Sequence, residues 1–232
     1  MPNPSLRLLS LDTSTAAGSI VLSEGDKLLG EINLEVAATH SARLLPGIEH
    51  VLKFAGISLS ELHALAVING PGSFTGLRIG LATVKGLAAA SGKPVIPINA
   101  FDAWAEKVHA GKGMLTVMID ARRQEVYSAT FQQVDQSWIP LLSGRVDKVE
   151  NLVPLFPTSP MQFVGDGALR YRPLLETPDH PEWRVVDCDC FLGRPLAKLA
   201  LQKALSGATL PAREVQAYYL RKSDAELCWK EK

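Results

Sequence analysis

At its most distinctive point the chain reads Ile68-Asn-Gly-Pro-Gly-Ser-Phe-Thr-Gly-Leu-Arg-Ile-Gly80. The apolar run Ala64–Ile68 predicts a strand that enters this glycine turn, and the residues after the turn predict a helix over about 75–91. Glycines permit positive φ angles, and the unpaired N–H groups at a helix start suit an anion. Small residues within a helix cost helix propensity, so we expect another element to approach this one closely.

Each half of the chain begins with three predicted strands, the first of which ends in an aspartate. These strands are expected at Leu6–Asp12, Ser19–Leu22 and Lys27–Leu34, and again at Met114–Asp120, Glu125–Phe131 and Trp138–Leu142. Shorter strands are expected at 94–98, 162–164 and 184–186, and further helices at about 41–55, 100–109 and 191–205. The pattern predicts an α/β fold with two duplicated β-β-β-α-β-α lobes.

The second lobe is the more degenerate of the two, because prolines interrupt its later half. We expect an N-terminal lobe over residues 1–103 and a C-terminal lobe over 104–232. The helix near 191–206 is expected to pack back onto the N-terminal lobe. Within that lobe, Pro46 is expected to bend the helix at 41–55 or to split off its first turn.

The composition is that of an ordinary globular protein. The chain has 232 residues, 47% hydrophobic and 21% charged, and its formal net charge is zero. Proteins that bind RNA alone usually carry a basic excess, so we expect a partner to supply most contacts to any RNA. No apolar run is long enough for a membrane span, and the first residues do not resemble a signal peptide, so a cytoplasmic protein is expected. Cys188, Cys190 and Cys228 are expected to be reduced, structural thiols.

Two turns carry residues that suit a phosphate or a metal ion. Asp12 follows the first strand and is a candidate ligand for a metal ion or water, with the neighbouring hydroxyls and N–H groups forming a phosphate loop. The candidate nucleotide- or phosphate-binding residues are Asp12, Thr13, Ser14, Gly70, Gly72, Ser73 and Asp120. The alternative is that the Asp and Thr side chains only satisfy turn amides. The glycine turn matches neither the Walker A pattern nor GxGxxG.

Asp12 and Asp120 occupy matching places in the two halves. An aspartate from each lobe facing one cleft is the arrangement of sugar kinases and related ATPases. An ATP-dependent small-molecule kinase is therefore one hypothesis. A peptidase has less support, because the sequence shows neither a GxSxG elbow nor two histidines four residues apart. We assign no catalytic residue and no metal site from the residues.

The helices at about 41–55 and 75–91 are rich in apolar residues, and the second is apolar on nearly every side. In the second helix one apolar line comprises Leu77, Leu81, Val84 and Ala88, and another comprises Ile79, Ala82, Gly86, Ala89 and Ala90. Such a helix is either fully buried or packs against a different chain, and we expect the second case. The candidate interface residues are Leu44, Leu45, Ile48, Leu52, Leu77, Arg78, Gly80, Leu81, Val84 and Lys85. The alternative for Arg78 and Lys85 is a solvated face.

Several motifs together suggest a family. They are Leu9-Ser-Leu-Asp-Thr-Ser14, His40-Ser-Ala-Arg-Leu-Leu-Pro46, Gly70–Gly80, Lys85-Gly-Leu-Ala88, Asp120-Ala-Arg-Arg-Gln-Glu-Val-Tyr127 and Tyr219-Leu-Arg221. In these segments the chain resembles the TsaB (YeaZ) family of bacterial tRNA threonylcarbamoyladenosine (t6A) synthesis. The resemblance implies a two-lobed fold of the actin, Hsp70 and sugar-kinase (ASKHA) type.

The chain also resembles TsaD, the catalytic relative of that family, around the first-lobe helix and the glycine turn. TsaD carries an H-x-x-x-H metal pair just after the strand that corresponds to 94–98 here. In this chain Ala100 and Trp104 stand where the two imidazoles would fall. Alanine cannot bind a metal and an indole N–H only donates, so the resemblance implies that this chain does not perform the transfer itself.

The resemblance implies a non-catalytic subunit required for threonylcarbamoyl transfer to N6 of adenosine 37 in ANN-decoding tRNAs. Such a subunit would heterodimerise with the metal-containing TsaD-type subunit through the helices at 41–55 and 75–91 and activate it. Further implied partners are a TsaE-type P-loop ATPase, a second copy of the chain when it is alone, and tRNA only through the complex. No cofactor is expected in the isolated chain, and ATP or ADP is expected near the partner junction. A kinase of the same fold is the alternative.

Overall fold

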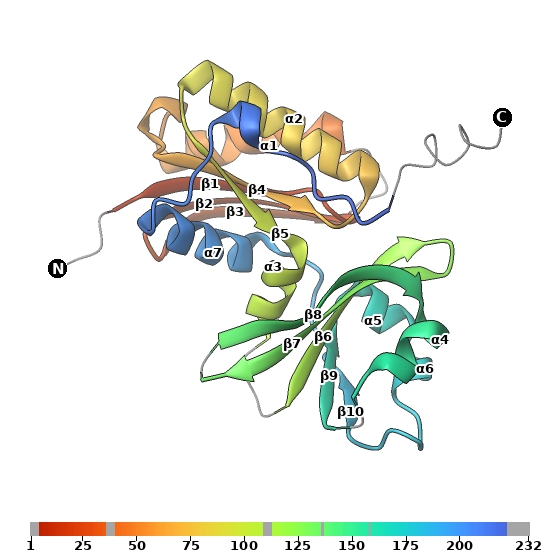
Figure 1. Ribbon diagram of the computed structural model, residues 1–232. Helices are drawn as coiled ribbons and strands as arrows, with labels where there is room; N and C mark the ends of the chain where they lie inside the picture. The colour runs from red at the N-terminus through yellow and green to blue at the C-terminus, as the bar shows by residue number, and fades with distance from the viewer. Residues whose placement is uncertain (1–4, 36–39, 109–112, 136, 158, 222–232) are drawn as a thin grey trace. The chain divides into compact units, whose positions relative to one another are not determined.

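The computed structural model describes residues 5–35, 40–108, 113–135, 137–157 and 159–221 (Figure 1). The chain divides into two compact units. Unit 1 comprises Met1–Ala103 and Phe191–Tyr218, and unit 2 comprises Trp104–Cys190 and Tyr219–Lys232. The late segment that contains the helix expected near 191–206 therefore belongs to unit 1. Cys228 and His109 lie outside the described residues.

Unit 1 is built on one five-stranded mixed sheet in the order β3-β2-β1-β4-β5. Its strands are β1 (Arg7–Asp12), β2 (Ala17–Glu24), β3 (Lys27–Glu35), β4 (Ala64–Gly70) and β5 (Val95–Asn99). Its helices are α1 (His40–Ala55), α2 (Phe74–Ser91) and α7 (Gly193–Leu205), with short 3-10 turns η1 (Leu59–Glu61) and η3 (Ala212–Glu214). Helix α3 (Ala100–Lys107) follows β5 and contains the boundary between the units.

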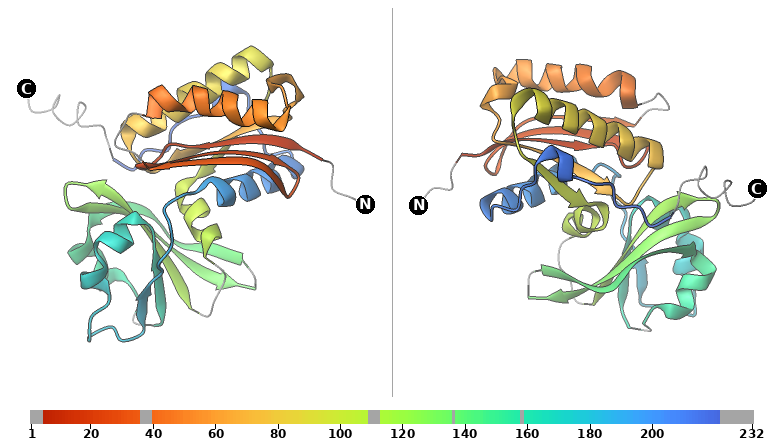
Figure 2. Two further views of the ribbon diagram at one scale, coloured as in Figure 1. Left: turned by 180° about the vertical axis from the view of Figure 1, so that it is seen from behind. Right: turned by 45° about the horizontal axis from the view of Figure 1, so that its top comes forward.

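Helices cover both faces of this sheet, with α1 and α2 on one face and α7 on the other (Figures 1 and 2). Strand β2 shows why both layers are needed, since its residues are buried on both sides along almost its whole length. A Cβ at Gly47 of α1 would meet Ile20, whereas a Cβ at Gly193 of α7 would meet Ser19 and Val21. Successive strand residues point to opposite faces, so each helix covers one of the two sets.

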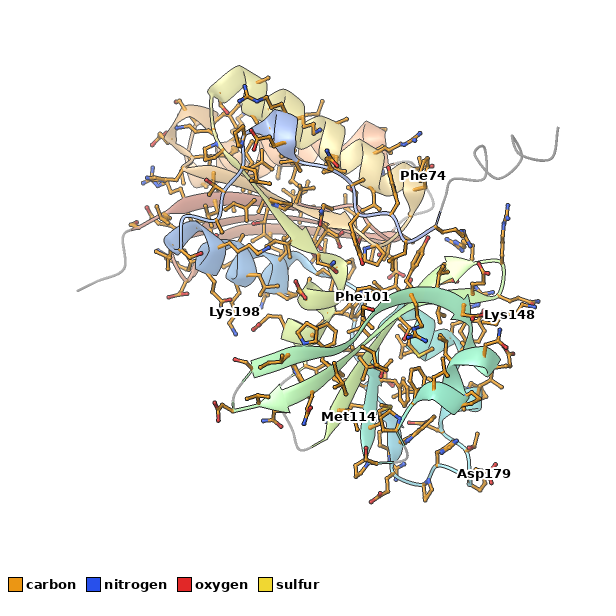
Figure 3. All side chains as sticks on the ribbon, viewed as in Figure 1. Phe74, Phe101, Met114, Lys148, Asp179 and Lys198 are labelled. Atoms are coloured by element: carbon orange, nitrogen blue, oxygen red, sulfur yellow. The ribbon has the colours of Figure 1, made fainter. Side chains whose placement is uncertain are left out.

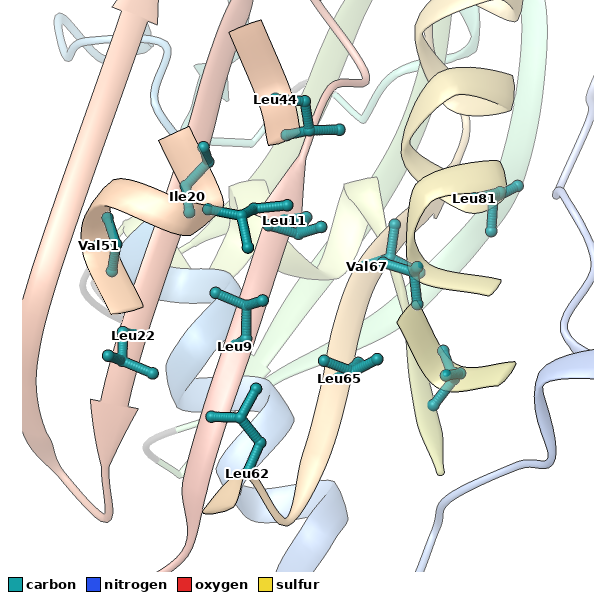
Figure 4. Close-up of a cluster of buried hydrophobic side chains, with 14 of the residues drawn as sticks. Leu9, Leu11, Ile20, Leu22, Leu44, Val51, Leu62, Leu65, Val67 and Leu81 are labelled. Atoms are coloured by element: carbon teal, nitrogen blue, oxygen red, sulfur yellow. The ribbon is translucent and has the colours of Figure 1, made fainter. Parts of the chain in front are cut away.

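The core of unit 1 lies between the sheet and the α1–α2 layer (Figure 4). Leu9, Leu11 and Leu65 of the central strands are fully buried there, and α1 contributes Leu44 and α2 contributes Leu81. Helix α1 is continuous through Pro46, so its first turn is not split off. Helix α2 is followed by Gly92, which has φ 69°, donates its N–H to the carbonyl oxygen of Ala88 and so caps the helix.

Unit 2 is built on a second five-stranded mixed sheet in the order β10-β9-β6-β7-β8. Its strands are β6 (Met114–Arg122), β7 (Glu125–Val134), β8 (Ser137–Lys148), β9 (Met161–Val164) and β10 (Trp183–Val185). Its helical segments are α4 (Val149–Leu152), η2 (Val153–Leu155), α5 (Asp166–Arg170) and α6 (Arg172–Leu175). Its core includes the mutually contacting rings of Phe156, Phe163 and Trp183.

The two sheets have the same topology. In each, the first strand pairs antiparallel with the second and parallel with the fourth, the second pairs antiparallel with the third, and the fourth pairs parallel with the fifth. The predicted duplication is therefore confirmed, and the second copy is the reduced one, because the short α5 follows β9 where α2 follows β4. In the described part of the chain, no helix is both long and apolar enough to span a membrane.

Candidate functional site

Hydrogen bonds within the chain hold the turn after β1 in place and join it to the start of α2. The Asp12 carboxylate is fully buried and accepts a hydrogen bond from the Ser14 N–H at 2.8 Å. The Thr13 hydroxyl donates to the carbonyl oxygen of Gly76 at 2.8 Å, and the Ser73 N–H donates to the carbonyl oxygen of Ser14 at 2.7 Å. The turn after β1 and the start of α2 are thus bonded directly to each other.

Three glycines make this approach sterically feasible. A Cβ at Gly72 would meet the carbonyl oxygen of Ser14, and a Cβ at Gly76 would meet the carbonyl oxygen of Thr13. A Cβ at Gly80 would meet the Thr13 hydroxyl. These small residues therefore allow the turn after β1 and the start of α2 to pack closely inside unit 1.

The other end of the glycine turn is covered by the last described segment of unit 1. Gly70 has φ 130°, and a Cβ there would meet the carbonyl oxygen of Tyr218. The Tyr218 N–H donates to the carbonyl oxygen of Asn69 at 2.7 Å, and the Asn69 side chain donates to the carbonyl oxygen of Gln216 at 3.1 Å. Val215, in the same segment, is buried in the core. No pattern in the sequence predicts that this segment covers the glycine turn.

Asp120 of unit 2 makes the same local bond as Asp12 of unit 1. Its carboxylate accepts from the Arg122 N–H at 2.9 Å, two residues further on, as Asp12 accepts from Ser14. Both aspartates therefore stabilise turns in the manner of an Asx turn, which was the alternative interpretation. Asp120 also forms an ion pair with Arg170 at 2.8 Å.

Asp166, at the start of α5, lies beside Asp120 and was not singled out from sequence. Its carboxylate accepts from the Asp120 N–H at 3.0 Å and from the Gly167 N–H at 2.9 Å. Burial raises the pKa of Asp166, and the negative charge of Asp120 raises it further, while the N–H donors lower it. The one signal for Asp166 in the sequence is its position directly after Gly165, the glycine that follows β9.

The predicted interface residues fall into two groups. Six are buried in the core of unit 1 and face its own sheet or strands: Leu44, Ile48, Leu77, Gly80, Leu81 and Val84. They cannot contact another chain directly, which corrects their assignment. Leu45 and Arg78 are exposed, and Leu52 and Lys85 are partly exposed. The apolar line that begins at Leu77 is the one that unit 1 buries.

The outer face of α1 and α2 carries exposed apolar residues beside charged ones such as Arg43, Glu49 and Lys53 of α1. We define it by the exposed residues Ala42, Leu45, Pro46 and Phe54 of α1 and Ala82, Gly86, Ala89 and Ala90 of α2. Leu45 is 56% exposed and Phe54 is 79% exposed. No other group lies within 4 Å of a Cβ placed at Gly86. Large exposed apolar side chains beside residues without bulk are typical of a protein-interaction surface.

Cationic groups border this outer face. The Arg78 guanidinium lies 3.7 Å from the ring centroid of Phe74, which Figure 3 labels at the start of α2. Lys85 lies two turns further along the same helix and is partly exposed. The His50 and Phe54 rings of α1 contact each other with centroids 4.4 Å apart. The border thus combines charge with aromatic surface, as interface rims and anchors do.

Ala100 and Trp104, where the resemblance places a metal pair in TsaD, are both fully buried. They lie four residues apart on α3, and neither side chain offers a metal ligand. Within the described residues, no three His, Cys, Asp or Glu side chains are grouped as a metal site would require. Cys188 and Cys190 carry thiols that form no disulfide.

The duplicated sheet topology defines the two-lobed actin, Hsp70 and sugar-kinase class of folds. Component A of (R)-2-hydroxyglutaryl-CoA dehydratase from Acidaminococcus fermentans shares this fold, with a TM-score of 0.52 and 10% identity over 86% of this chain and 99% of that one. The family model described as TsaD, tRNA N6-adenosine threonylcarbamoyltransferase, matches residues 30–172.

Relatives with higher sequence identity to this chain are named TsaB or YeaZ. The tRNA threonylcarbamoyladenosine biosynthesis protein TsaB of Haemophilus influenzae is 34% identical over 97% of this chain and 96% of its own length. The structure of YeaZ from Pseudomonas aeruginosa superimposes with a TM-score of 0.78 and 30% identity, and covers 93% of this chain and 100% of that one. The chain therefore belongs to the TsaB (YeaZ) family, within the wider family that the TsaD model describes.

Proposed function

We propose that this chain is a non-catalytic subunit of the machinery that transfers a threonylcarbamoyl group to N6 of adenosine 37 in ANN-decoding tRNAs. It acts by heterodimerising with a TsaD-type catalytic subunit and activating it. The observation that carries the proposal is the exposed apolar outer face of α1 and α2 in a chain whose relatives are named for t6A biosynthesis.

Helix α3 supports the proposal that the catalytic metal belongs to the TsaD-type subunit and not to this chain. The two positions that correspond to the metal pair of TsaD hold a methyl group and an indole, both fully buried. An indole N–H only donates and a methyl group has no lone pair, so neither side chain can bind a metal ion. We therefore assign the metal and the transfer chemistry to the partner.

The mode of association is supported by the shape of the outer face. Gly86 leaves open space on α2, and the neighbouring alanines add little bulk, so a partner helix can approach closely. Leu45 and Phe54 supply apolar area that water covers in the isolated chain. The same face would pair two copies of the chain when the catalytic subunit is absent, because related folds offer equivalent surfaces.

A TsaE-type P-loop ATPase completes the proposed assembly. Because Gly72 and Gly76 are packed against the turn after β1, we place any ATP or ADP with the partners or at their junction rather than in that turn. Transfer RNA is reached within the complex, in keeping with the zero net charge of the chain.

Substitution of Gly86 tests the proposed interface. Gly86→Arg places a long charged side chain on the outer face, where the isolated chain has room for it. We expect the variant to fold normally and to lose the heterodimer with the TsaD-type subunit, as measured by size-exclusion chromatography with light scattering. Gly86→Ala adds only a methyl group and should retain the complex.

The matched control is Gln202→Arg on α7. Gln202 is exposed and lies on the helix that covers the opposite face of the same sheet. This variant should form the heterodimer as the parent chain does. An unchanged heterodimer for Gly86→Arg would remove α2 from the interface and with it the proposed mode of association.

A further inference from the structure

The hairpin that joins β6 to β7 is a strained turn made of polar residues with long side chains. Arg122, Arg123 and Gln124 have φ angles of 63°, 54° and 64°. Left-handed backbone is disfavoured for residues with a Cβ, and Asn and Gly are the usual occupants of such a turn. All three residues are exposed. Unit 2 thus has two solvent-exposed arginines at backbone positions where glycine would be less strained.

Two further arginines from other segments converge on the same hairpin. The Arg170 guanidinium of α5 lies 2.8 Å from one oxygen of Asp120, and the Arg122 guanidinium lies 3.8 Å from that same oxygen. Arg221, near the end of the described chain, donates to Glu125 at 2.6 Å and to the carbonyl oxygen of Ala121 at 2.9 Å. We call these residues, Arg122, Arg123, Arg170 and Arg221, the arginine cluster.

The carboxylates nearby neutralise only part of this charge. Asp120 shares one oxygen between two guanidiniums, and Glu125 is paired with Arg221. Asp166 is directed at the Asp120 and Gly167 N–H groups, from which its carboxylate accepts hydrogen bonds, and within the described residues no ion pair joins it to an arginine of the cluster. Lys148, labelled in Figure 3, is the cross-strand neighbour of Glu125 and adds a positive charge at the same end of the sheet.

The outer members of the cluster are the ones available to a ligand. The Arg122 side chain is 77% exposed and the Arg170 side chain is 51% exposed. Arg221 is held by its bonds to Glu125 and Ala121, so it supports the turn from within. A guanidinium presents a planar set of donors that matches the oxygens of a phosphate.

We propose that the arginine cluster is a phosphate-binding surface that contacts the sugar–phosphate backbone of tRNA within the assembled complex. The ligand class rests on the proposed function, because that function brings tRNA to the complex. Contacts of this kind position a nucleic acid without reading its sequence. An acidic protein segment is the competing ligand for the same charges, and the experiment below separates the two.

Comparison of the β6–β7 turn with the turn after β1, its topological counterpart in unit 1, supports a binding role for the β6–β7 turn. Both turns follow the first strand of their sheet and both begin with an aspartate that bonds two residues ahead. In unit 1 the turn is buried, and Thr13 and Ser14 are bonded to α2 and the segment before it. In unit 2 the same place carries exposed arginines. Packing against α2 therefore accounts for the first turn, whereas the arginine side chains of the second turn reach the surface.

The experiment measures binding of unmodified tRNA, by fluorescence anisotropy over a range of salt concentrations, to the complex with the TsaD-type subunit and to the chain alone. The test variant is the double substitution Arg122→Gly and Arg123→Gly, which removes two charges and suits the left-handed backbone. We expect affinity to fall about tenfold or more, and the slope of log K against log salt to fall by roughly two. Thermal stability should not fall.

Two further variants serve as controls. Arg122→Lys with Arg123→Lys keeps the charge and should recover much of the salt dependence. Arg184→Gln removes one exposed charge from β10 at the other end of the same sheet and should leave binding unchanged, because Arg184 aligns through β9 with Leu115 at the start of β6.

Heterodimer formation is measured for every variant by light scattering, without tRNA. Unchanged tRNA binding by the double glycine variant would overturn the proposal, whether or not heterodimer formation changes. If the heterodimer is lost and tRNA binding is kept, the cluster binds an acidic protein segment instead. If the parent chain forms no heterodimer at all, the proposed function fails, and the tRNA measurements on the chain alone still decide whether the arginines bind RNA.

Discussion

At the scale of single residues, the glycines around α2 differ in what they do although the sequence presents them alike. Gly76 and Gly80 approach Thr13 so closely that a methyl group would collide with it, whereas Gly86 faces open space. Helical spacing alone cannot separate them, because it does not say which side of the helix meets the sheet. The first two glycines are needed for packing within unit 1, and the third is exposed with open space beside it.

Alanine substitutions at two of these glycines should have opposite effects on stability. Gly76→Ala places its Cβ against a backbone carbonyl oxygen, so neighbouring backbone must shift, and we expect a loss of about 1–3 kcal/mol in the free energy of unfolding. Gly86→Ala improves helix propensity without a clash and should gain up to about 1 kcal/mol. Urea denaturation measures both. Equal effects at the two positions would mean that the close contact with Thr13 is not present in solution.

The buried carboxyl of Asp166 gives a prediction about pH. Its pKa is raised in the folded chain, so the native state holds this proton more tightly than the unfolded state. Ionisation of Asp166 therefore lowers the free energy of unfolding as pH rises from the ordinary aspartate pKa through the raised one. Asp166→Asn keeps an oxygen that can accept from the N–H groups of Asp120 and Gly167, and it removes the charge.

We therefore expect the stability of Asp166→Asn relative to the parent chain to increase as pH rises above about 4, the ordinary aspartate pKa. Urea unfolding across that range gives the difference directly. A difference that is constant with pH, or that falls as pH rises, would contradict the raised pKa. Asp147→Asn is a useful comparison, because hydrogen bonds from Asn151 and the Lys148 N–H lower the pKa of that aspartate, so the stability of this variant relative to the parent chain should fall as pH rises toward about 4 and stay constant above it.

At the scale of elements, strands and long helices were predictable from hydrophobic pattern, and surfaces were not. Helix α2 and the two sets of paired strands appear where the sequence predicts them. The side of α2 that faces out was assigned incorrectly, because both lines of the helix are apolar and only the sheet decides which line it buries. Gly86, which faces out, was therefore missing from the predicted interface residues.

The elements of unit 2 were harder to predict for a different reason. Strand β8 extends to Lys148, well beyond the predicted Leu142, because it lies at the sheet edge and many of its side chains face water without a clear alternation. The short helices α4 and α6 contain four residues each, fewer than a periodic pattern needs to be recognised. The arginine cluster joins the β6–β7 turn, α5 and the chain end, so local sequence could not reveal it.

The outer face of α1 gives a prediction about self-association. The double substitution Leu45→Ser and Phe54→Ser removes two exposed apolar side chains and leaves the core unchanged, so the fold should be retained. We expect the isolated parent chain to sediment as a homodimer and the double variant as a monomer in analytical ultracentrifugation. Leu205→Ser on α7, an exposed position on the helix of the opposite sheet face, should leave the homodimer intact. Dimerisation that survives the α1 substitutions would place the contact elsewhere.

At the scale of the whole molecule, two copies of one topology have taken different forms. Unit 1 has long helices on both sheet faces and an outer face suited to a partner helix, while unit 2 has short helices and an exposed arginine turn. The duplicated fold was predictable because the strand–Asp–turn pattern recurs in the sequence. How each copy is used was not predictable from sequence, because it depends on which turn is buried and which is exposed.

The most direct test of the account is a reconstituted transfer reaction on unmodified tRNA, with the activated threonyl substrate, ATP and the P-loop ATPase present in every arm. We predict t6A at adenosine 37 only when this chain and the TsaD-type subunit are both added, and none when this chain is added without that subunit. Formation of the modified base by this chain without the catalytic relative would contradict the central claim. Equal activity of the catalytic relative with and without this chain would also contradict it.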